Sequence, residues 1–315
     1  MKYLFILLLS FYFISGCSFS GKKYSIKIDS LQTYGDNGEN LIGHISNVRY
    51  KNGKVYIWDG VELEMFVYKI NGEIIKKLQL GNGRGPGEFT KYFTLSFDVI
   101  SDTTLVFLDF MQKRVQFISI NGNYLSGFNT QITPWRMYYR DSLLYFSDVN
   151  SSKSSLIFAY TLSGKKVTSL VKVKPFTTKK NKPVLMPAID IEDDLSIYYA
   201  NSIKTEITKW QNDTLQWTFS DEKLDLIPSS IDNNSKGWSS FFVYQNYFIA
   251  STYDNNSIIK GEILLIDKNT GQLLYAKKQK TMFSADSFEN NKYIFMSSNV
   301  PYPHLNRIDL KIVKE

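Results

Sequence analysis

A strand-rich unit recurs along this chain of 315 residues, and the repetition limits the fold more than any other feature. In each copy an apolar strand ends near Asp or Asn, a polar turn follows, and two further strands are joined by a tight turn. The six copies pair residues 53–59 with 65–80, 104–109 with 114–128, 143–148 with 156–171, 195–201 with 205–219, 245–252 with 261–278, and 291–299 with 304–315. The tight turns are marked by Gly72, Gly122, Gly164, Asp213 and Gly271, which are 50, 42, 49 and 58 residues apart. Repeats of about 40–50 residues are typical of the blades of β-propellers.

A further apolar segment precedes the first strand of a copy, as at 45–50, 92–100 and 135–140, and would form the innermost of four strands. The sixth copy lacks an outer strand, and the alternating segment 24–31 at the N-terminus could supply it, which would remove an open sheet edge. The sequence therefore predicts an all-β fold over 24–315: a six-bladed β-propeller with four-stranded blades, in which the N-terminal strand closes the last blade.

Two other interpretations, a short helix and a pair of β-sandwiches, fit parts of the sequence. Residues 61–69 could form a short helix, but they continue into the hairpin turn Asn71-Gly72. Two β-sandwiches would also contain many short strands. All eight prolines fall in the predicted loops, as the lack of a proline N–H requires, and the recurring unit together with these prolines favours the propeller. A hydrophobic content of 43% with 15% aromatic residues excludes a disordered chain.

The second copy resembles a known family of blades. The pattern D-x-x-x-x-R-V-Q-F from Asp109 to Phe117 is similar to NHL-type blades, and the loop LGNGRGPGEF (80–89) resembles the signature of the 6-bladed β-propeller lipoproteins of Bacteroidetes, an NHL/TolB-like group. Thr252 and Asn299 stand where this pattern expects Asp. The resemblance implies a propeller over the whole mature chain, but the group has no single activity to transfer.

The N-terminus predicts export and a lipid anchor. Residues 1–16 combine Lys2 with an apolar run and a small-residue end, which is the pattern of a signal peptide. The segment ISGC resembles a lipobox, in which Cys17 is acylated, and 17–23 would then form a lipidated tether. The alternative is an ordinary signal peptide whose cleavage site neighbours a cysteine. Cys17 is the chain's one cysteine, so an internal disulfide and a cysteine-rich zinc site are excluded.

The predicted location is therefore the cell envelope, with the lipid bilayer as a partner through Cys17. In lipoproteins of Bacteroidetes, surface export is associated with acidic residues just after this cysteine. Lys22 and Lys23 stand there instead, which favours the periplasmic face. The formal net charge of +7 is scattered, and the densest basic run, 171–183, is typical of a solvated loop. No basic stripe with interleaved aromatic residues is present, so nucleic acid is not an expected partner.

Long loops on one rim of the propeller predict a single binding face. The segments 32–44, 80–91, 172–187, 221–238 and 253–260 all join strands at that rim in the predicted arrangement. The candidate ligand-binding residues on it are Arg84, Glu88, His44, His304 and Trp238. The alternative interpretations are that Arg84 and Glu88 lock two blades together, that the histidines are ordinary surface residues, and that the tryptophan packs between blades.

Six further polar residues lie in the predicted strands. Asp59, Asp109 and Asp148 recur at the end of the second strand, which indicates side-chain caps on the following turns. The inner strands offer Asn47, Asp98 and Asp190 as candidate metal ligands over the central channel. No metal-binding motif supports these three, and no cofactor is predicted.

Three functions remain open from the sequence. The first is a membrane-anchored binding module that presents its loop-rich rim to an unknown glycan, peptide or envelope protein. The second is a metal-dependent hydrolase or lyase, because six-bladed propellers that resemble lactonases hold a metal in the channel. The third is an architectural subunit of an envelope complex. A serine hydrolase is excluded, since no G-x-S-x-G motif is present.

Overall fold

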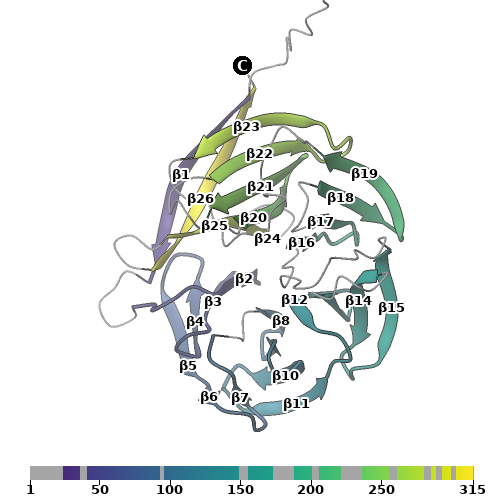
Figure 1. Cartoon of the computed structure of the whole chain (residues 1–315). Coiled ribbons are helices and arrows are strands. Elements are labelled where there is room, and N and C mark those ends of the chain that lie inside the picture. The colour runs from purple at the N-terminus through teal and green to yellow at the C-terminus, as the bar shows by residue number, and fades with distance from the viewer. Residues whose placement is uncertain are drawn as a thin grey trace, which may run out of the picture.

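The computed structural model describes residues 24–35, 41–92, 96–148, 155–172, 188–200, 206–220, 236–254, 261–279, 285–288, 293–298 and 303–314. Over these ranges the chain forms six four-stranded antiparallel sheets around a common centre, as Figure 1 shows. None of these ranges contains a helix that could cross a membrane. The predicted signal peptide, Cys17 and the tether lie outside the described residues, as do most of the loops 172–187, 221–238 and 253–260.

Each blade runs from an inner to an outer strand. Blade 1 consists of β2 (Asn47–Lys51), β3 (Lys54–Asp59), β4 (Glu64–Lys69) and β5 (Ile74–Gln79); blade 2 of β8 (Ser96–Ser101), β9 (Thr104–Asp109), β10 (Arg114–Ser119) and β11 (Tyr124–Asn129); blade 3 of β12 (Pro134–Arg140), β13 (Leu143–Asp148), β14 (Ser155–Thr161) and β15 (Lys166–Lys172). Blade 4 consists of β16 (Ala188–Ile191), β17 (Ile197–Ala200), β18 (Glu206–Gln211) and β19 (Thr214–Ser220); blade 5 of β20 (Lys236–Tyr244), β21 (Tyr247–Asp254), β22 (Gly261–Asp267) and β23 (Leu273–Gln279); blade 6 of β24 (Ala285–Phe288), β25 (Tyr293–Ser298), β26 (His304–Lys314) and β1 (Tyr24–Tyr34).

The N-terminal strand closes the ring. β1 pairs antiparallel with β26, with Tyr24 opposite Lys314 and Tyr34 opposite Leu305. The register shifts between Ser30 and Gln32, so that Leu31 forms a bulge. Both the six-bladed fold and the closing role of the N-terminal strand are confirmed, and β1 extends beyond the predicted 24–31.

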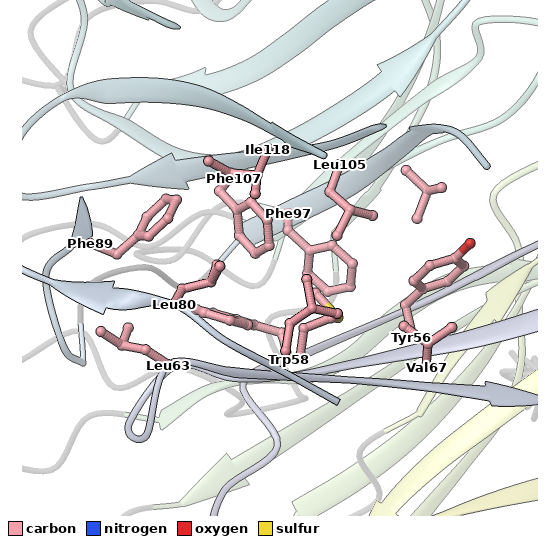
Figure 2. Close-up of a cluster of buried hydrophobic side chains, with 13 residues drawn as sticks. Tyr56, Trp58, Leu63, Val67, Leu80, Phe89, Phe97, Leu105, Phe107 and Ile118 are labelled. Carbon is pink, nitrogen blue, oxygen red and sulfur yellow. The ribbon is translucent and has the colours of Figure 1, made fainter. Parts of the chain in front are cut away.

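The hydrophobic core is divided among the six seams between neighbouring blades. Strand β3 shows why: Val55 and Ile57 face blade 6, whereas Tyr56 and Trp58 face blade 2, because successive side chains of a strand point to opposite faces. Each middle strand is therefore apolar on both faces. Figure 2 shows the seam between blades 1 and 2, where the rings of Trp58 and Phe107 meet edge to face with centroids 4.9 Å apart. Burying one such side chain stabilises the fold by about 1.5–3 kcal/mol.

Some local predictions differ from the structure. Residues 64–69, in contrast, form strand β4 and no helix, as predicted. The inner strand of blade 6, β24, was not identified in the sequence, because its four residues ADSF lack a clear apolar pattern. Pro134 is the first residue of β12 and not part of a loop. A proline is tolerated at this position since the first residue of a strand need not donate to the ladder.

Candidate functional site

A buried aspartate fixes the turn between the second and third strands of blade 1. The Asp59 carboxylate accepts hydrogen bonds from the backbone N–H groups of Val61 and Glu62, at 2.9 and 3.0 Å, and from His44 N–H at 2.7 Å. One fully buried side chain thus holds both its own turn and the segment that leads into inner strand β2. Both segments belong to one rim of the propeller, called the loop-bearing rim, which is formed by residues 41–46, 60–63, 80–92 and 110–113. Asp59 therefore anchors this rim to the end of strand β3.

Asp109 repeats the arrangement in blade 2. Its carboxylate accepts N–H from Gln112 at 3.0 Å and from Thr90 at 2.8 Å, and Thr90 precedes inner strand β8. Asp148 occupies the equivalent position in blade 3 and is also buried, but the turn that follows it lies outside the described residues. The recurrence that singled out these aspartates in the sequence therefore corresponds to turn-capping bonds in blades 1 and 2.

The glycine-rich loop folds around one of its own side chains. The carboxylate of Glu88 accepts N–H from Gly85 at 2.7 Å, and short strands β6 (Gly81–Asn82) and β7 (Glu88–Phe89) pair in parallel beside it. A Cβ at Gly85 would lie 3.0 Å from the Glu88 carboxylate oxygen, which is closer than most Cβ contacts. Glu88 is therefore committed to loop structure, and this geometry gives no support to its predicted role in ligand binding.

Blade 2 clamps the same loop through polar side chains of β10. Arg114 donates to the carbonyl oxygens of Arg84 and Glu88 at 2.8 and 2.7 Å. Gln116 donates to the Glu88 carbonyl at 2.7 Å and accepts N–H from Gly87 at 2.8 Å. Four hydrogen bonds thus tie the connection leaving blade 1 to the middle of blade 2. Arg114 and Gln116 are both part of the NHL-like pattern R-V-Q-F, but the pattern did not predict that Gln116 holds the glycine-rich loop.

Arg84 remains available for contacts. Its backbone is held by Arg114, its side chain is exposed, and its guanidinium forms no hydrogen bond or ion pair within the described ranges. An arginine on a braced loop is positioned to meet an anionic or carbonyl group of a partner.

The two histidines lie on adjacent blades. The His44 ring contacts the Ser46 hydroxyl at 3.1 Å in the segment that leads into blade 1. His304 is the first residue of β26 in blade 6 and pairs with Ser298. Trp238 lies in inner strand β20, opposite Thr252, so it belongs to a strand and not to the predicted loop 221–238; its side chain is outside the described part.

Charged side chains of the inner strands link blades 1, 2 and 3 to one another. Arg49 is buried and donates to Asn47 Oδ1 at 2.8 Å, while its Nε lies 3.6 Å from Asp98 Oδ1. Asp98 also accepts the backbone N–H of Tyr139 in blade 3 at 2.8 Å. The Arg49 guanidinium lies over the ring of Tyr138, 5.2 Å from its centroid. Asn47 and Asp98 therefore belong to an arginine-centred network.

Asp190 links the inner strands of blades 4 and 5 in the same way. Its carboxylate accepts Ile191 N–H at 2.8 Å and, from blade 5, Val243 N–H at 3.0 Å, which parallels the bonds of Asp98. The described residues contain no group of three or more His, Cys, Asp and Glu side chains that could hold a metal ion. The hydrogen bonds of Asp98 and Asp190 hold neighbouring inner strands in register.

The loop-bearing rim also carries exposed apolar residues that the sequence did not single out. Tyr92, Met111 and Leu41 are 62%, 56% and 49% exposed. Nearby, Phe110 and Trp135 meet edge to face with centroids 5.4 Å apart. Tyr92, Met111 and Leu41 come from three separate loops, so no linear motif could have grouped them.

The backbone of Tyr92 is unusual. Its φ of +65° lies in the left-handed region, which a bulky side chain seldom adopts, and its N–H donates to the Gly60 carbonyl at 2.9 Å. Such strain costs about 1–3 kcal/mol and tends to gather at functional sites. Tyr92 is thus presented outward by a constrained backbone.

Solved structures similar to this chain include several bacterial proteins. They include a protein named as a candidate exported protein from Bacteroides fragilis (TM-score 0.62, 14% identity, covering 91% of this chain and 95% of that chain). A member of the duf4221 family from Bacteroides vulgatus has a TM-score of 0.62 and 10% identity, covering 93% and 98%. Virginiamycin B lyase from Staphylococcus aureus has a TM-score of 0.50 and 10% identity, covering 91% and 99%. At these identities the likeness is one of fold. No curated protein matches the chain.

The family assignment rests on most of the sequence. Residues 30–297 match the family DUF5128, described as 6-bladed beta-propeller, and this range includes the whole loop-bearing rim. The match agrees with the six sheets arranged as six blades. The chain therefore belongs to this family of six-bladed β-propellers.

Proposed function

We propose that this protein is an exported envelope lipoprotein that docks a partner protein on its loop-bearing rim. One observation carries the binding role: Tyr92, Met111 and Leu41 are each exposed on loops of one rim that buried aspartates hold in place. Aromatic residues, methionine and arginine are enriched at protein interfaces, and Arg84 lies on the same rim.

Two features support the export and the anchor. The leader ends at Cys17, the one cysteine of the chain, which a lipid anchor would consume as a thioether. The likeness to a candidate exported protein from Bacteroides fragilis agrees with an envelope location. The test is labelling with a radioactive fatty acid. Cys17→Ser should abolish the label and move the protein from the membrane fraction, and a labelled Cys17→Ser protein would contradict the anchor.

The binding face is tested by site-specific photo-crosslinking in the envelope. Benzoylphenylalanine in place of Tyr92 should yield a discrete crosslinked species. The matched control is the same group in place of Asn52, which is exposed, also has a positive φ, and lies in the β2–β3 hairpin on the opposite rim. The identified partner should bind the Tyr92→Ala, Met111→Ala double variant at least about tenfold more weakly. Equal crosslinking from Asn52, or unchanged affinity of the double variant, would refute docking on this rim.

A further inference from the structure

A groove opens in the outer wall where the ring closes. Its volume is about 570 Å³, within the range of roughly 300–1,000 Å³ that small-molecule sites occupy. It lies between β1 of blade 6 and the β4–β5 hairpin of blade 1, which are neighbours at the closure in Figure 1. Its lining includes Leu31, Gln32, Thr33, Tyr34, Asn71 and Gly72.

The equivalent position at other seams is filled by apolar side chains. The hairpin glycine of blade 3, Gly164, is covered by Phe128 from the outer strand of blade 2. Gly271 of blade 5 is covered in the same way by Trp217 of blade 4, and Gly122 of blade 2 lies against Leu78 of blade 1. At the closing seam the covering residue is Gln32, against Gly72. This seam therefore has a polar cover.

The bulge in β1 contributes to the opening. Leu31 is the extra residue and points largely to solvent, with 55% of its surface exposed. Beside it, the Thr33 hydroxyl donates to Asn306 Oδ1 at 2.9 Å, which holds the strand after the bulge to β26. A bulge twists and redirects a strand, and here it replaces continuous apolar packing with polar side chains.

The two walls of the groove are tied together beneath it. The Tyr34 hydroxyl donates to the Ile70 carbonyl at 2.8 Å, and Arg307 Nη1 donates to the same oxygen at 3.4 Å. Burial raises the pKa of Tyr34 to about 12, opposed by the positive charge of Arg307, so the hydroxyl keeps its proton at neutral pH. The groove is consequently preformed, which lowers the entropic cost of binding.

The chemistry of the lining selects for uncharged polar ligands. Among the described residues that line the groove none is charged, although 21% of the chain is charged. Gln32 donates to the Thr33 carbonyl, which leaves its amide oxygen as an acceptor on one wall. Asn71 accepts Glu73 N–H, which leaves its amide NH₂ as a donor on the other wall. An acceptor and a donor on facing walls match a hydroxyl group, which both donates and accepts.

From the cover, the preformed walls and the neutral lining, we infer that this groove binds a hydroxyl-rich, uncharged ligand of the size of a mono- or disaccharide. The groove is formed by β1 and the β4–β5 hairpin, whereas the exposed residues of the proposed docking face lie on other segments, 41–46, 80–92 and 110–113. Binding here and docking on the rim can therefore succeed or fail independently.

The experiment uses the full-length chain in a detergent without a sugar headgroup. Maltose, cellobiose and diacetylchitobiose are the probes, with glucuronic acid as the charged comparison, and binding is measured by saturation-transfer NMR and calorimetry. At least one neutral sugar should bind. Gln32→Phe, which copies the cover provided by Phe128, should weaken that sugar at least about tenfold, and Asn71→Ala, which leaves the groove open, at least about threefold.

The matched control is Gln216→Phe, the same substitution at an exposed position of outer strand β19, which should bind as the wild type does. Three results would overturn the inference: no neutral sugar bound at about 10 mM, binding unchanged by both groove variants, or binding of glucuronic acid alone. The photo-crosslink at Tyr92 should persist in Gln32→Phe, which separates this site from the rim.

Discussion

A single buried carboxylate at the end of a second strand holds two loops of this propeller. Asp59 reaches forward to the turn at Val61 and back to His44, so one side chain fixes the height of the rim relative to the blade. The sequence predicted the turn cap from recurrence alone. The bond back to His44 needed the three-dimensional structure, because it joins segments 15 residues apart.

Replacing Asp59 should therefore cost more than replacing an aspartate that caps a turn near the surface. Asp59→Ala leaves buried N–H donors without their acceptor, and we expect a loss of about 3 kcal/mol in the free energy of unfolding. The comparison is Asp267→Ala, which removes a cap on Asn269 and Thr270 N–H in a more exposed hairpin and should cost about 1 kcal/mol. Urea denaturation of both variants measures the difference, and equal losses would refute the two-loop role of Asp59.

Buried tyrosines should limit stability at high pH. Burial raises the pKa of Tyr56 to about 12, with a smaller contribution from the negative charge of Asp102. Below a pH of about 10 both the folded and unfolded states keep the proton. Above it the unfolded state loses the proton first, so the contribution of Tyr56 to stability should decline between pH 10 and the folded pKa.

Thermal unfolding measured from pH 8 to 12 checks this expectation. The melting temperature of Tyr56→Phe should fall less steeply with pH than that of the wild type. Parallel curves for the two proteins would show that Tyr56 does not titrate in this range.

At the scale of strands and hairpins, the sequence was most informative where a residue type has one structural reason. The markers Gly72, Gly122, Gly164 and Gly271 all have φ between +73° and +90°, and Asp213 has φ of +58°. The short strand β24 carries no comparable constraint and was not found. The clamp of Gln116 on the glycine-rich loop was also beyond prediction, since its partner Gly87 is 29 residues away.

The hairpin glycines should be intolerant of side chains for two separable reasons. At Gly164 a side chain would be forced into a positive φ, which is unfavourable for L-residues, and its Cβ would lie 2.5 Å from Phe128 Cγ of the neighbouring blade. Gly53 has a φ of +76° with nothing within 4 Å of such a Cβ, so it isolates the backbone effect. We expect Gly53→Ala to cost about 1 kcal/mol and Gly164→Ala about 1–3 kcal/mol more.

Chemical denaturation gives both values. If Gly164→Ala is no more destabilising than Gly53→Ala, then the hairpin does not pack tightly against the preceding blade.

For the whole molecule, closure through β1 is the decisive feature. Tyr24 lies opposite Lys314, so the two ends of the propeller sequence are paired neighbours. The sequence predicted this closure because the sixth copy lacked one strand and the N-terminus had one to spare. The groove at the seam could not be predicted, since its walls come from β1 and the β4–β5 hairpin.

A circular permutant tests the closure. Joining Lys314 to Tyr24 through a short glycine-rich turn, with the new N-terminus at Leu41, makes blade 6 continuous and should preserve the fold, as judged by circular dichroism and a melting temperature within a few degrees of the wild type. Deleting 24–35 removes the partner of β26 and exposes a sheet edge. The deletion variant should aggregate or lose cooperative unfolding, and a stable monomer would refute the closing role of β1.

Pairing of the first strand with the last also sets the order of events during synthesis. β1 leaves the ribosome before any blade exists, and its partner β26 is among the last segments to be made, about 280 residues later. Blade 6 therefore cannot be completed on a growing chain. The contact between β1 and β26, which spans the largest sequence separation, forms at the end. The ring therefore closes only after β26 has been synthesised, by a contact between the two most distant strands of the propeller sequence.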